Sequence, residues 1–217
     1  MKIDRLILGA YETNCYVLRK ESLGLRSGET AEDCLIVDAG LGPSQLINFL
    51  KEHKLNPVAA ALTHGHIDHI AAVAALRAQF PDIKVYIHKL DARMLTGAEH
   101  NLSTLAGVQF SANAADLLIE DSDVIEQAGV KLQVLHTPGH TPGGICLYSK
   151  DEGLVFVGDT LFADSIGRTD FPGGSMTQLI TGITEKLFTL PDETVVFPGH
   201  GPTTNIAHEK AHNPFLR

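Results

Sequence analysis

The stretch Thr63-His64-Gly65-His66-Ile67-Asp68-His69 decides the fold, and it directly follows a short apolar segment at residues 58–62. That segment has the length and composition of a buried strand, and the Ala-rich residues 70–80 predict a helix after it. His64 and His66 stand two apart on extended chain, so their rings project to the same side. The next two polar residues, Asp68 and His69, fall where the helix begins. One short segment therefore offers two nitrogens to one metal ion, and a carboxylate and a nitrogen to a neighbouring ion.

Three further predicted strands end in residues of the metal-ligand type. The strand at 131–135 leads to His140, the strand at 154–157 to Asp159, and the strand at 194–197 to His200. Loops that leave strand ends commonly build sites, so we expect these side chains to converge with His64, His66, Asp68 and His69. Asp159 is the candidate to bridge two ions, because a carboxylate has two oxygens. A set of only His and Asp suits zinc, iron(II) or manganese.

Apolar runs and turn residues predict alternating strands and helices along the rest of the chain. Strands are expected at 3–9, 14–19, 34–38, 85–87 and 145–148, and helices from Pro43, at 176–187 and at 206–212. The polar residues 20–33 are interpreted as a long exposed hairpin loop. Residues 96–123 show no clean period and are interpreted as short helical turns in a surface excursion resembling a lid. The expected architecture is one α/β domain over 1–217, with two sheets between helices.

Composition limits the classes of function. A length of 217 residues fits one domain, or at most two small ones. The formal net charge of −9 without basic clusters argues against nucleic acid and anionic membrane as partners. No stretch is long and apolar enough to span a bilayer, and the N-terminus lacks a signal-peptide layout, so a cytoplasmic location is expected. Cys15, Cys34 and Cys146 are few and widely spaced, which predicts buried thiols in strands.

The remaining histidines do not share the strand-end pattern. We expect His136, beside the Thr-Pro-Gly-His turn, to have a hydrogen-bonding role, and His88 to be structural. The other four, which lie in polar or helical contexts, are expected to face solvent: His53, His100, His208 and His212.

The motif His64-Gly-His66-Ile-Asp68-His69 resembles the HxHxDH signature of the metallo-β-lactamase superfamily, and the resemblance continues in order through His140, Asp159 and His200. The family's fold is an αββα sandwich. The resemblance implies that His64, His66 and His140 bind a first metal, that Asp68, His69 and His200 bind a second, and that Asp159 bridges both. Asp38 resembles the family's aspartate that supports the site without binding metal, and a purely structural role at a strand end is the alternative.

Within the superfamily, the chain is most similar to glyoxalase II-like hydrolases of the short bacterial type. The segments that carry this resemblance are Gly158-Asp-Thr-Leu-Phe162, Gly167-Arg-Thr-Asp170, Phe197-Pro-Gly-His200 and the tail from Gly201 to Leu216. The resemblance implies hydrolysis of a small thioester such as S-lactoylglutathione. Long glyoxalase II enzymes carry a helical domain that grips glutathione, whereas seventeen residues follow His200 here.

Thioester hydrolysis also follows from the chemistry of the expected site. Two metals about 3.5–4 Å apart share a hydroxide at neutral pH, because a bound metal lowers the pKa of water toward about 7. A thiolate leaves without a separate general acid, since an alkyl thiol has a pKa of about 8.5. Lactone cleavage fits the same site. Asp68 and Asp159 are the candidate catalytic residues, and zinc is the expected metal.

Arg168 is the candidate substrate-binding residue, because its loop resembles one that binds the thiol-carrying part of the substrate and a guanidinium suits a carboxylate. A solvated charge, with Asp170 holding Arg168 in place, is the alternative.

Three other functions compete with thioester hydrolysis. A persulfide dioxygenase would use a single iron at positions matching His64, His140 and Asp159. A nuclease is disfavoured by the acidic balance of the chain. A non-catalytic metal-binding protein is the third alternative.

Overall fold

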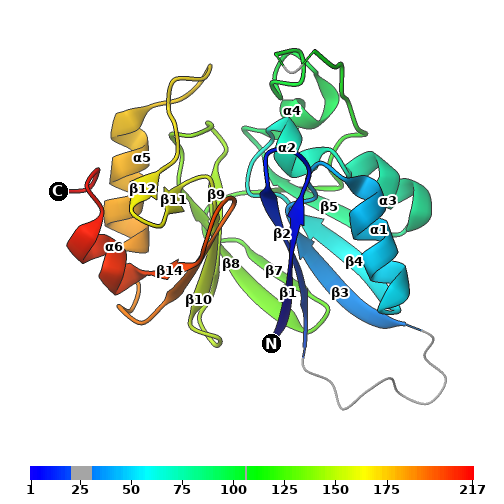
Figure 1. Cartoon of the computed structure of the whole chain (residues 1–217), viewed down its shortest axis with the longest axis horizontal. Coiled ribbons are helices and arrows are strands. Elements are labelled where there is room, and N and C mark those ends of the chain that lie inside the picture. The colour runs from blue at the N-terminus through cyan, green and yellow to red at the C-terminus, as the bar shows by residue number, and fades with distance from the viewer. Residues whose placement is uncertain (21–30, 106) are drawn as a thin grey trace.

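Two β-sheets lie face to face between two layers of helices in a computed structural model that describes residues 1–20, 31–105 and 107–217 (Figure 1). In the described ranges, each large sheet has six strands. The first runs in the order β1 (Lys2–Leu8), β2 (Thr13–Arg19), β3 (Glu32–Val37), β4 (Leu55–Ala61), β5 (Lys84–His88) and β6 (Leu117–Ile119). Neighbours from β1 to β3 pair antiparallel, and those from β3 to β6 pair parallel.

The second sheet is antiparallel except for one pair. Its order is β14 (Thr204–Asn205), β13 (Val195–Pro198), β10 (Leu154–Gly158), β9 (Ile145–Ser149), β8 (Val130–His136) and β7 (Val124–Gln127). The parallel pair is β10 with β13, so these two strands end at the same edge of the sheet. A small hairpin of β11 (Leu161–Phe162) and β12 (Ser165–Ile166) follows β10.

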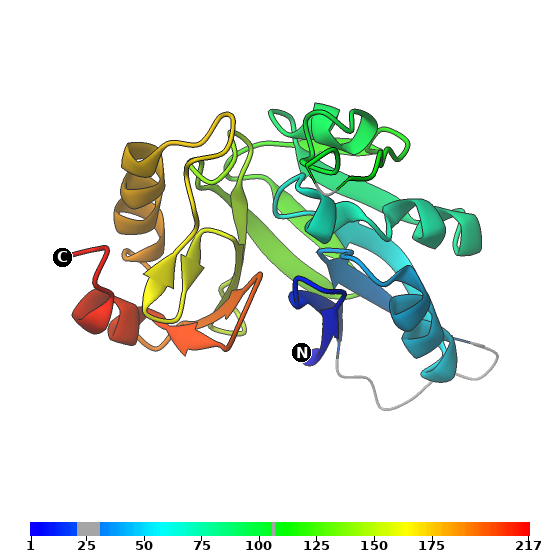
Figure 2. The same cartoon turned by 45° about the horizontal axis from the view of Figure 1, so that its top comes forward.

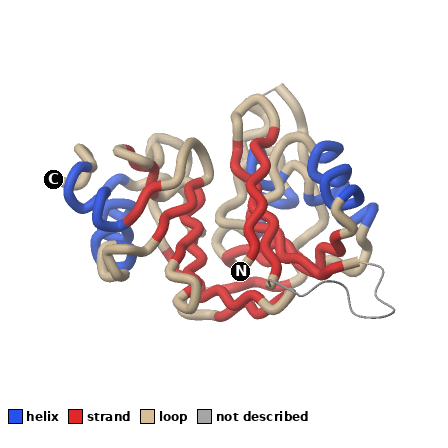
Figure 3. Tube along the Cα trace, turned by 60° about the horizontal axis from the view of Figure 1, so that its bottom comes forward, coloured by secondary structure: helices blue, strands red, loops and turns tan. Residues whose placement is uncertain are grey.

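Helices cover the outer face of each sheet, as Figures 2 and 3 also show. Beside the first sheet lie α1 (Pro43–Glu52), α2 (Ile67–Ile70), α3 (Val73–Gln79) and α4 (Ala92–Thr96). Beside the second lie α5 (Met176–Gly182), the π-helical turn η1 (Ile183–Leu187) and α6 (Ile206–His212). This is the αββα sandwich that the resemblance implied.

Strand β3 shows why the central strands are apolar on both faces. Leu35 and Val37 pack into the core between the two sheets, whereas Cys34 and Ile36 pack into the core under α1 and α3. A strand covered on both sides reads as a continuous apolar run. All three cysteines are buried in strands, as expected.

The helix expected at 70–80 is wrong in its continuity. The chain forms α2, breaks at residues 71–72 and resumes as α3. Residue Ala39, just past β3, causes the break. Its backbone N–H donates to the carbonyl of His69 at 2.8 Å, and its carbonyl accepts from the N–H of Ala72 at 2.8 Å. These backbone groups are therefore taken by the neighbouring strand end rather than by the helix.

The interpretation of residues 96–123 as helical turns is correct for its first part and wrong for its last. Turns follow α4, but residues 117–119 form β6, which pairs parallel with β5. Leu117 and Leu118 are both exposed, so the strand lacks the alternation that a sequence pattern needs. The helix expected at 176–187 changes to a π-helical turn at Ile183, where Phe188 N–H donates to the carbonyl five residues back at 2.8 Å.

Most of the loop expected at 20–33 lies outside the described residues. Over the described ranges, no helix is both long and apolar enough to cross a membrane.

Candidate metal centre

The predicted ligands meet at one edge of the two sheets, where the loops after β4, β8, β10 and β13 come together. They form overlapping groups in which the possible ligand atoms lie within 4.8 Å of one another. The groups are His64, His66 and His140; His64, His69 and Asp159; and Asp68, His69 and His200. The strand-end argument therefore predicted the convergence of all seven residues.

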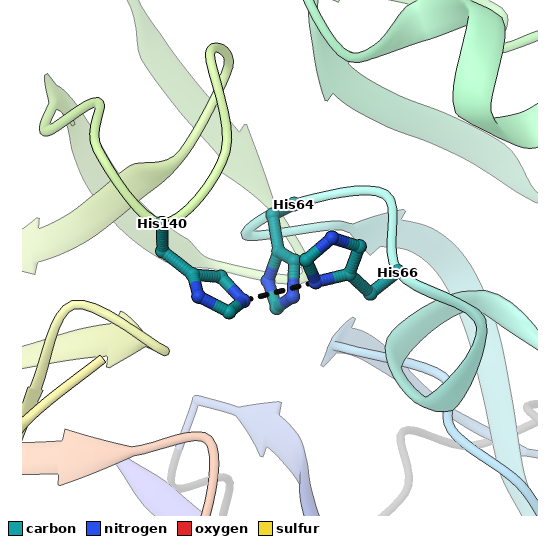
Figure 4. Close-up of side chains that lie close together, drawn as sticks. All are labelled: His64, His66 and His140. Carbon is teal, nitrogen blue, oxygen red and sulfur yellow. Dashed lines mark hydrogen bonds between the residues drawn. The ribbon is translucent and has the colours of Figure 1, made fainter. Parts of the chain in front are cut away.

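The first set consists of three buried histidines whose rings face one another (Figure 4). His66 Nδ1 lies 2.9 Å from His140 Nε2, and the ring of His64 stands edge-on to both, with centroids 4.8 Å away. The same-side projection expected for residues 64 and 66 is confirmed. This arrangement places three imidazole nitrogens around one point, which is a geometry that suits a divalent cation.

The second set is formed by a carboxylate and two imidazoles. Asp68 Oδ2 lies 3.2 Å from His200 Nε2 and 3.4 Å from His69 Nε2, and the two Nε2 atoms are 3.4 Å apart. The hydroxyl of Thr13 donates to the same Asp68 oxygen at 3.1 Å. Asp68 itself sits in the first turn of α2, as the sequence predicted.

Asp159 lies between the two sets. Its Oδ1 is 3.3 Å from His69 Nε2 but makes no hydrogen bond with it, and its Oδ2 is 3.6 Å from His140 Nε2 and 3.5 Å from His200 Nε2. The loops around this carboxylate are tightly packed, because a Cβ added at Gly199 would overlap Asp159 Oδ1. Oδ2 thus lies near imidazoles of both sets and Oδ1 lies near His69 of the second, so the carboxylate is within reach of both sets, as a bridging ligand must be.

Backbone and side-chain acceptors fix the tautomers of the histidines. His140 Nδ1 donates to the carbonyl of Arg168 at 2.8 Å, and His200 Nδ1 donates to the carbonyl of Tyr11 at 3.0 Å. A carbonyl only accepts, so each Nδ1 carries a proton, and each Nε2 points into the site, where it is the nitrogen available to a metal ion. Such outer hydrogen bonds orient metal-ligating histidines.

Asp38 performs the same task for two other rings. Its Oδ2 accepts from His69 Nδ1 at 2.9 Å and from the hydroxyl of Thr63 at 2.8 Å, and that hydroxyl lies 3.2 Å from His64 Nδ1. The carboxylate also accepts from Thr63 N–H at 2.8 Å. The two alternatives for Asp38 are therefore compatible, since one buried group ends a strand and orients two histidines.

The two sets differ in charge. Burial, followed by the neighbouring histidines, lowers the pKa of His64, and it lowers the pKa of His66 to about 3. Burial alone would also lower the pKa of His200, but the carboxylates of Asp159 and Asp68 raise it to about 9. The pKa of His69 is likewise raised, by its three carboxylate neighbours against burial. At neutral pH these shifts favour neutral imidazoles at His64 and His66 and protonated ones at His69 and His200 in the metal-free protein.

The donor set fits divalent ions. Across the described ranges, three buried side-chain polar atoms have no hydrogen-bond partner, and two of them are His64 Nε2 and Asp159 Oδ1. An unpartnered buried polar atom is costly. Here an imidazole nitrogen and a carboxylate oxygen on two neighbouring side chains both lack a partner, which indicates a place for a positively charged ion. A divalent ion would satisfy both, because possible ligand atoms of His64 and Asp159 lie within 4.8 Å of each other.

A cavity of about 340 Å³ opens onto the site. Its lining is Tyr11, His66, Ile67, Asp68, Leu102, Leu105, His140, Asp159, Arg168, Phe171 and His200. Arg168 lies at this cavity, but Asp170 binds its guanidinium at 2.7 Å through both carboxylate oxygens, and the guanidinium stacks on Phe171 at 3.9 Å. Both interpretations of Arg168 thus find support: it borders the site, and Asp170 pins it.

The histidines outside the site lie as expected, and His136 makes one contact that was not predicted, with the ring of His88. His136 Nε2 donates to the carbonyl of Pro142 at 2.9 Å, and its ring stacks on buried His88 at 4.1 Å. His53 and His212 are exposed, and His100 and His208 are partly exposed. Sequence reasoning missed Asp91, a buried carboxylate beside the first set, because a lone Asp before a short helix carries no distinctive signal.

A family model of the metallo-beta-lactamase superfamily matches residues 8–200. The chain belongs to the metallo-β-lactamase superfamily. It is a metal-dependent hydrolase of that superfamily. The matched range contains all seven predicted ligands, from His64 to His200, so the family assignment and the geometry concern the same site.

Two curated relatives are similar to this chain over its whole length. "Probable metallo-hydrolase YqgX" of Bacillus subtilis is 41% identical over 217 residues, covering 100% of this chain and 98% of the relative. "Hydroxyacylglutathione hydrolase GloC" of Haemophilus influenzae is 31% identical over 218 residues, with the same coverage.

Two solved metallo-β-lactamase-fold structures are also similar. The BLEG-1 B3 metallo-beta-lactamase has a TM-score of 0.90 and 38% identity, covering 99% of each chain. TTHA1623 in a di-iron-bound form has a TM-score of 0.81 and 35% identity, covering 98% of this chain and 100% of that one.

Proposed function

We propose that this metallo-hydrolase cleaves a small thioester, such as S-lactoylglutathione, at a centre of two zinc ions. The observation that carries the proposal is the position of Asp159 between two sets of imidazoles whose Nε2 atoms face its carboxylate. In this proposal the first ion is held by His64, His66 and His140, the second by Asp68, His69 and His200, and both by Asp159. The similarity to a hydroxyacylglutathione hydrolase supports the substrate class.

Divalent ions held by these residues would supply a hydroxide at neutral pH and would stabilise negative charge on a carbonyl oxygen. In this proposal the chain's own residues hold the ions and orient the ligand side chains. Burial opposes the ionisation of Asp68, but His69 and His200 lower its pKa to about 2. Asp68 and Asp159 are therefore ionised at neutral pH and act as ligands and hydrogen-bond acceptors rather than as proton donors.

The lining of the cavity favours a leaving group that needs no proton. Apart from the candidate ligands, the ionisable groups among the described lining residues are Tyr11 and Arg168. Arg168 is always protonated and does not act as an acid. A thiolate, whose conjugate thiol has a pKa of about 8.5, leaves without help, whereas an amine must first gain a proton. The site therefore suits a thioester better than an amide.

The test combines metal analysis with three substrates. We expect about two zinc ions per chain and hydrolysis of S-lactoylglutathione without oxygen uptake. A His140→Ala variant should lose turnover, whereas His212→Ala, which changes an exposed histidine outside the site, should keep it. Cleavage of a β-lactam alone would replace the thioester with the substrate class named by the similar BLEG-1 structure.

The persulfide dioxygenase is the alternative that the same experiment separates. It requires a two-histidine, one-carboxylate iron site, and His64, His140 and Asp159 supply that combination within the larger group. One iron per chain, oxygen uptake with glutathione persulfide and no thioester cleavage would together overturn the hydrolase proposal.

A further inference from the structure

Asp91 is a buried carboxylate outside the seven candidate ligands. It directly precedes α4 and has no solvent exposure. Its Oδ2 accepts from the hydroxyl of Thr141 at 2.7 Å and from Gly65 N–H at 3.2 Å, and its Oδ1 accepts from Gly143 N–H at 2.7 Å. Both oxygens are thus engaged by donors from other parts of the chain, and none of the donors belongs to α4.

The three donors come from the two loops that carry the first histidine set. Gly65 lies between His64 and His66, and Thr141 directly follows His140. The loops are far apart in the chain, and in the site they meet where His66 Nδ1 lies 2.9 Å from His140 Nε2 and the rings of His64 and His140 stand 4.8 Å apart. Outside the site, the N–H of Ile145 donates to the carbonyl of Thr63 at 2.9 Å. One carboxylate behind the site therefore ties together the two loops whose spacing determines how the three imidazoles meet.

The packing around Asp91 leaves little freedom. A Cβ added at Gly143 would lie 2.7 Å from Asp91 Cγ, and one added at Gly65 would lie 2.7 Å from Met94 Sδ. Real Cβ atoms do not approach other atoms this closely, so both positions require glycine for the backbones to reach α4 and the carboxylate. The two loops are seated on the same short segment, which fixes their separation.

The second set is oriented by different groups. His200 is held by the carbonyl of Tyr11, His69 by Asp38, and Asp68 by the hydroxyl of Thr13. No described hydrogen bond joins Asp91 to any of these. A change at Asp91 therefore reaches the first set directly and the second only indirectly, through Asp159 and through Asp38, which links His69 to His64 by way of Thr63.

We propose that Asp91 is the positioning residue that sets the spacing of His64, His66 and His140 and thereby the affinity of the first metal site. The proposal rests on the metal assignment of the proposed function. Outer hydrogen-bond partners that orient metal ligands have large effects, and their loss typically weakens metal binding by about 10- to 100-fold. Asp91 acts one step further out, on the loops instead of the rings, and it acts on three ligands together.

The test is a zinc titration of metal-depleted Asp91→Asn against a coloured chelator, which yields two stepwise binding constants. Asn has the same shape but only one acceptor oxygen, so at least one of the three donors loses its partner. We expect one zinc constant to fall by about 10- to 100-fold and the other to stay within about twofold. The cobalt(II) absorption spectrum of the weakened site should also change. Repeating the titration in a His200→Ala background, where the first set is intact, assigns the weakened site.

Two further variants complete the design. Glu209→Gln is the matched control, because Glu209 is also fully buried and accepts from Thr204 Oγ1 at 2.6 Å and from Asn213 Nδ2 at 2.8 Å, away from the first set. It should destabilise the fold without weakening the first zinc constant. Thr141→Val removes one donor to Asp91 and should weaken the same constant by a smaller factor.

The possible outcomes separate the metal assignment from the positioning role of Asp91. Fewer than two zinc ions in the unaltered protein would count against the metal assignment and not against Asp91. Unchanged constants in Asp91→Asn, or an equal loss at both sites, would overturn the positioning role. If Asp91→Asn does not fold, Thr141→Val decides, and an unchanged first constant there would overturn the proposal.

Discussion

Replacing Asp159 tests the arrangement of the whole centre, because it is the residue that reaches both ligand sets. Its Oδ2 is 3.6 Å from His140 Nε2 and 3.5 Å from His200 Nε2, and its Oδ1 is 3.3 Å from His69 Nε2. In Asp159→Ala each ion loses one ligand. If each loss costs at least the 10- to 100-fold typical of outer partners, the affinity for the pair falls by about 100- to 10,000-fold, or about 3–5.5 kcal/mol.

The assay is metal content per chain after dialysis against a weak chelator, followed by the same chelator titration. Asp159→Ala should retain almost no zinc, whereas Asp159→Asn, which keeps one acceptor oxygen and no charge, should retain more than Asp159→Ala. A His200→Ala protein is the comparison, since it removes a ligand from one set alone. Two tightly bound ions in Asp159→Ala, or a loss no larger than that in His200→Ala, would refute the bridging assignment.

The remaining predictions concern single features of the site. His200→Ala should keep about one zinc per chain by elemental analysis and lose most hydrolysis, and full activity with two ions would remove His200 from the centre. Arg168→Ala should raise KM for an anionic thioester by up to about fivefold with little change in kcat, because the exposed guanidinium also binds Asp170. An unchanged KM in steady-state kinetics would show that Arg168 is a solvated charge. Zinc binding to the second set should strengthen from pH 6 to 9 and release protons, because a metal binds neutral imidazole and the pKa of His200 is raised to about 9. Calorimetry in buffers of different ionisation enthalpy measures the number of protons released. Zinc affinity that does not change with pH would contradict this prediction.

Two buried carboxylates support the ligand side chains from behind the site. Asp38 connects His69 and, through Thr63, His64, whereas Asp91 connects the loops of residues 64–66 and 140–143. Both carboxylates are buried and neither belongs to a ligand group. If the proposed metal sites form, we expect these two carboxylates to influence their affinities together with the ligands themselves.

The sequence by itself predicted the fold class and the convergence of the seven candidate ligands, because both are written in local patterns. The apolar segment at 58–62 is followed within two residues by His64, and β10 directly by Asp159, and the order of strands and helices in each half fits two covered sheets. The short spacing from His64 to His69 confines four ligand-type residues to one loop and one helical turn. Neither conclusion needs any knowledge of distant contacts.

Only the tertiary structure decided the features that depend on partners far away in the chain. Helix α2 ends at Ile70 because Ala39 takes the backbone groups around it, and β6 is a strand because β5 offers an edge. The role of Asp91 depends on donors 26 and 52 residues away. The raised pKa of His200 likewise comes from carboxylates that only the fold brings near. Hydrogen bonds and electrostatic fields act through space, so a local sequence pattern does not record them.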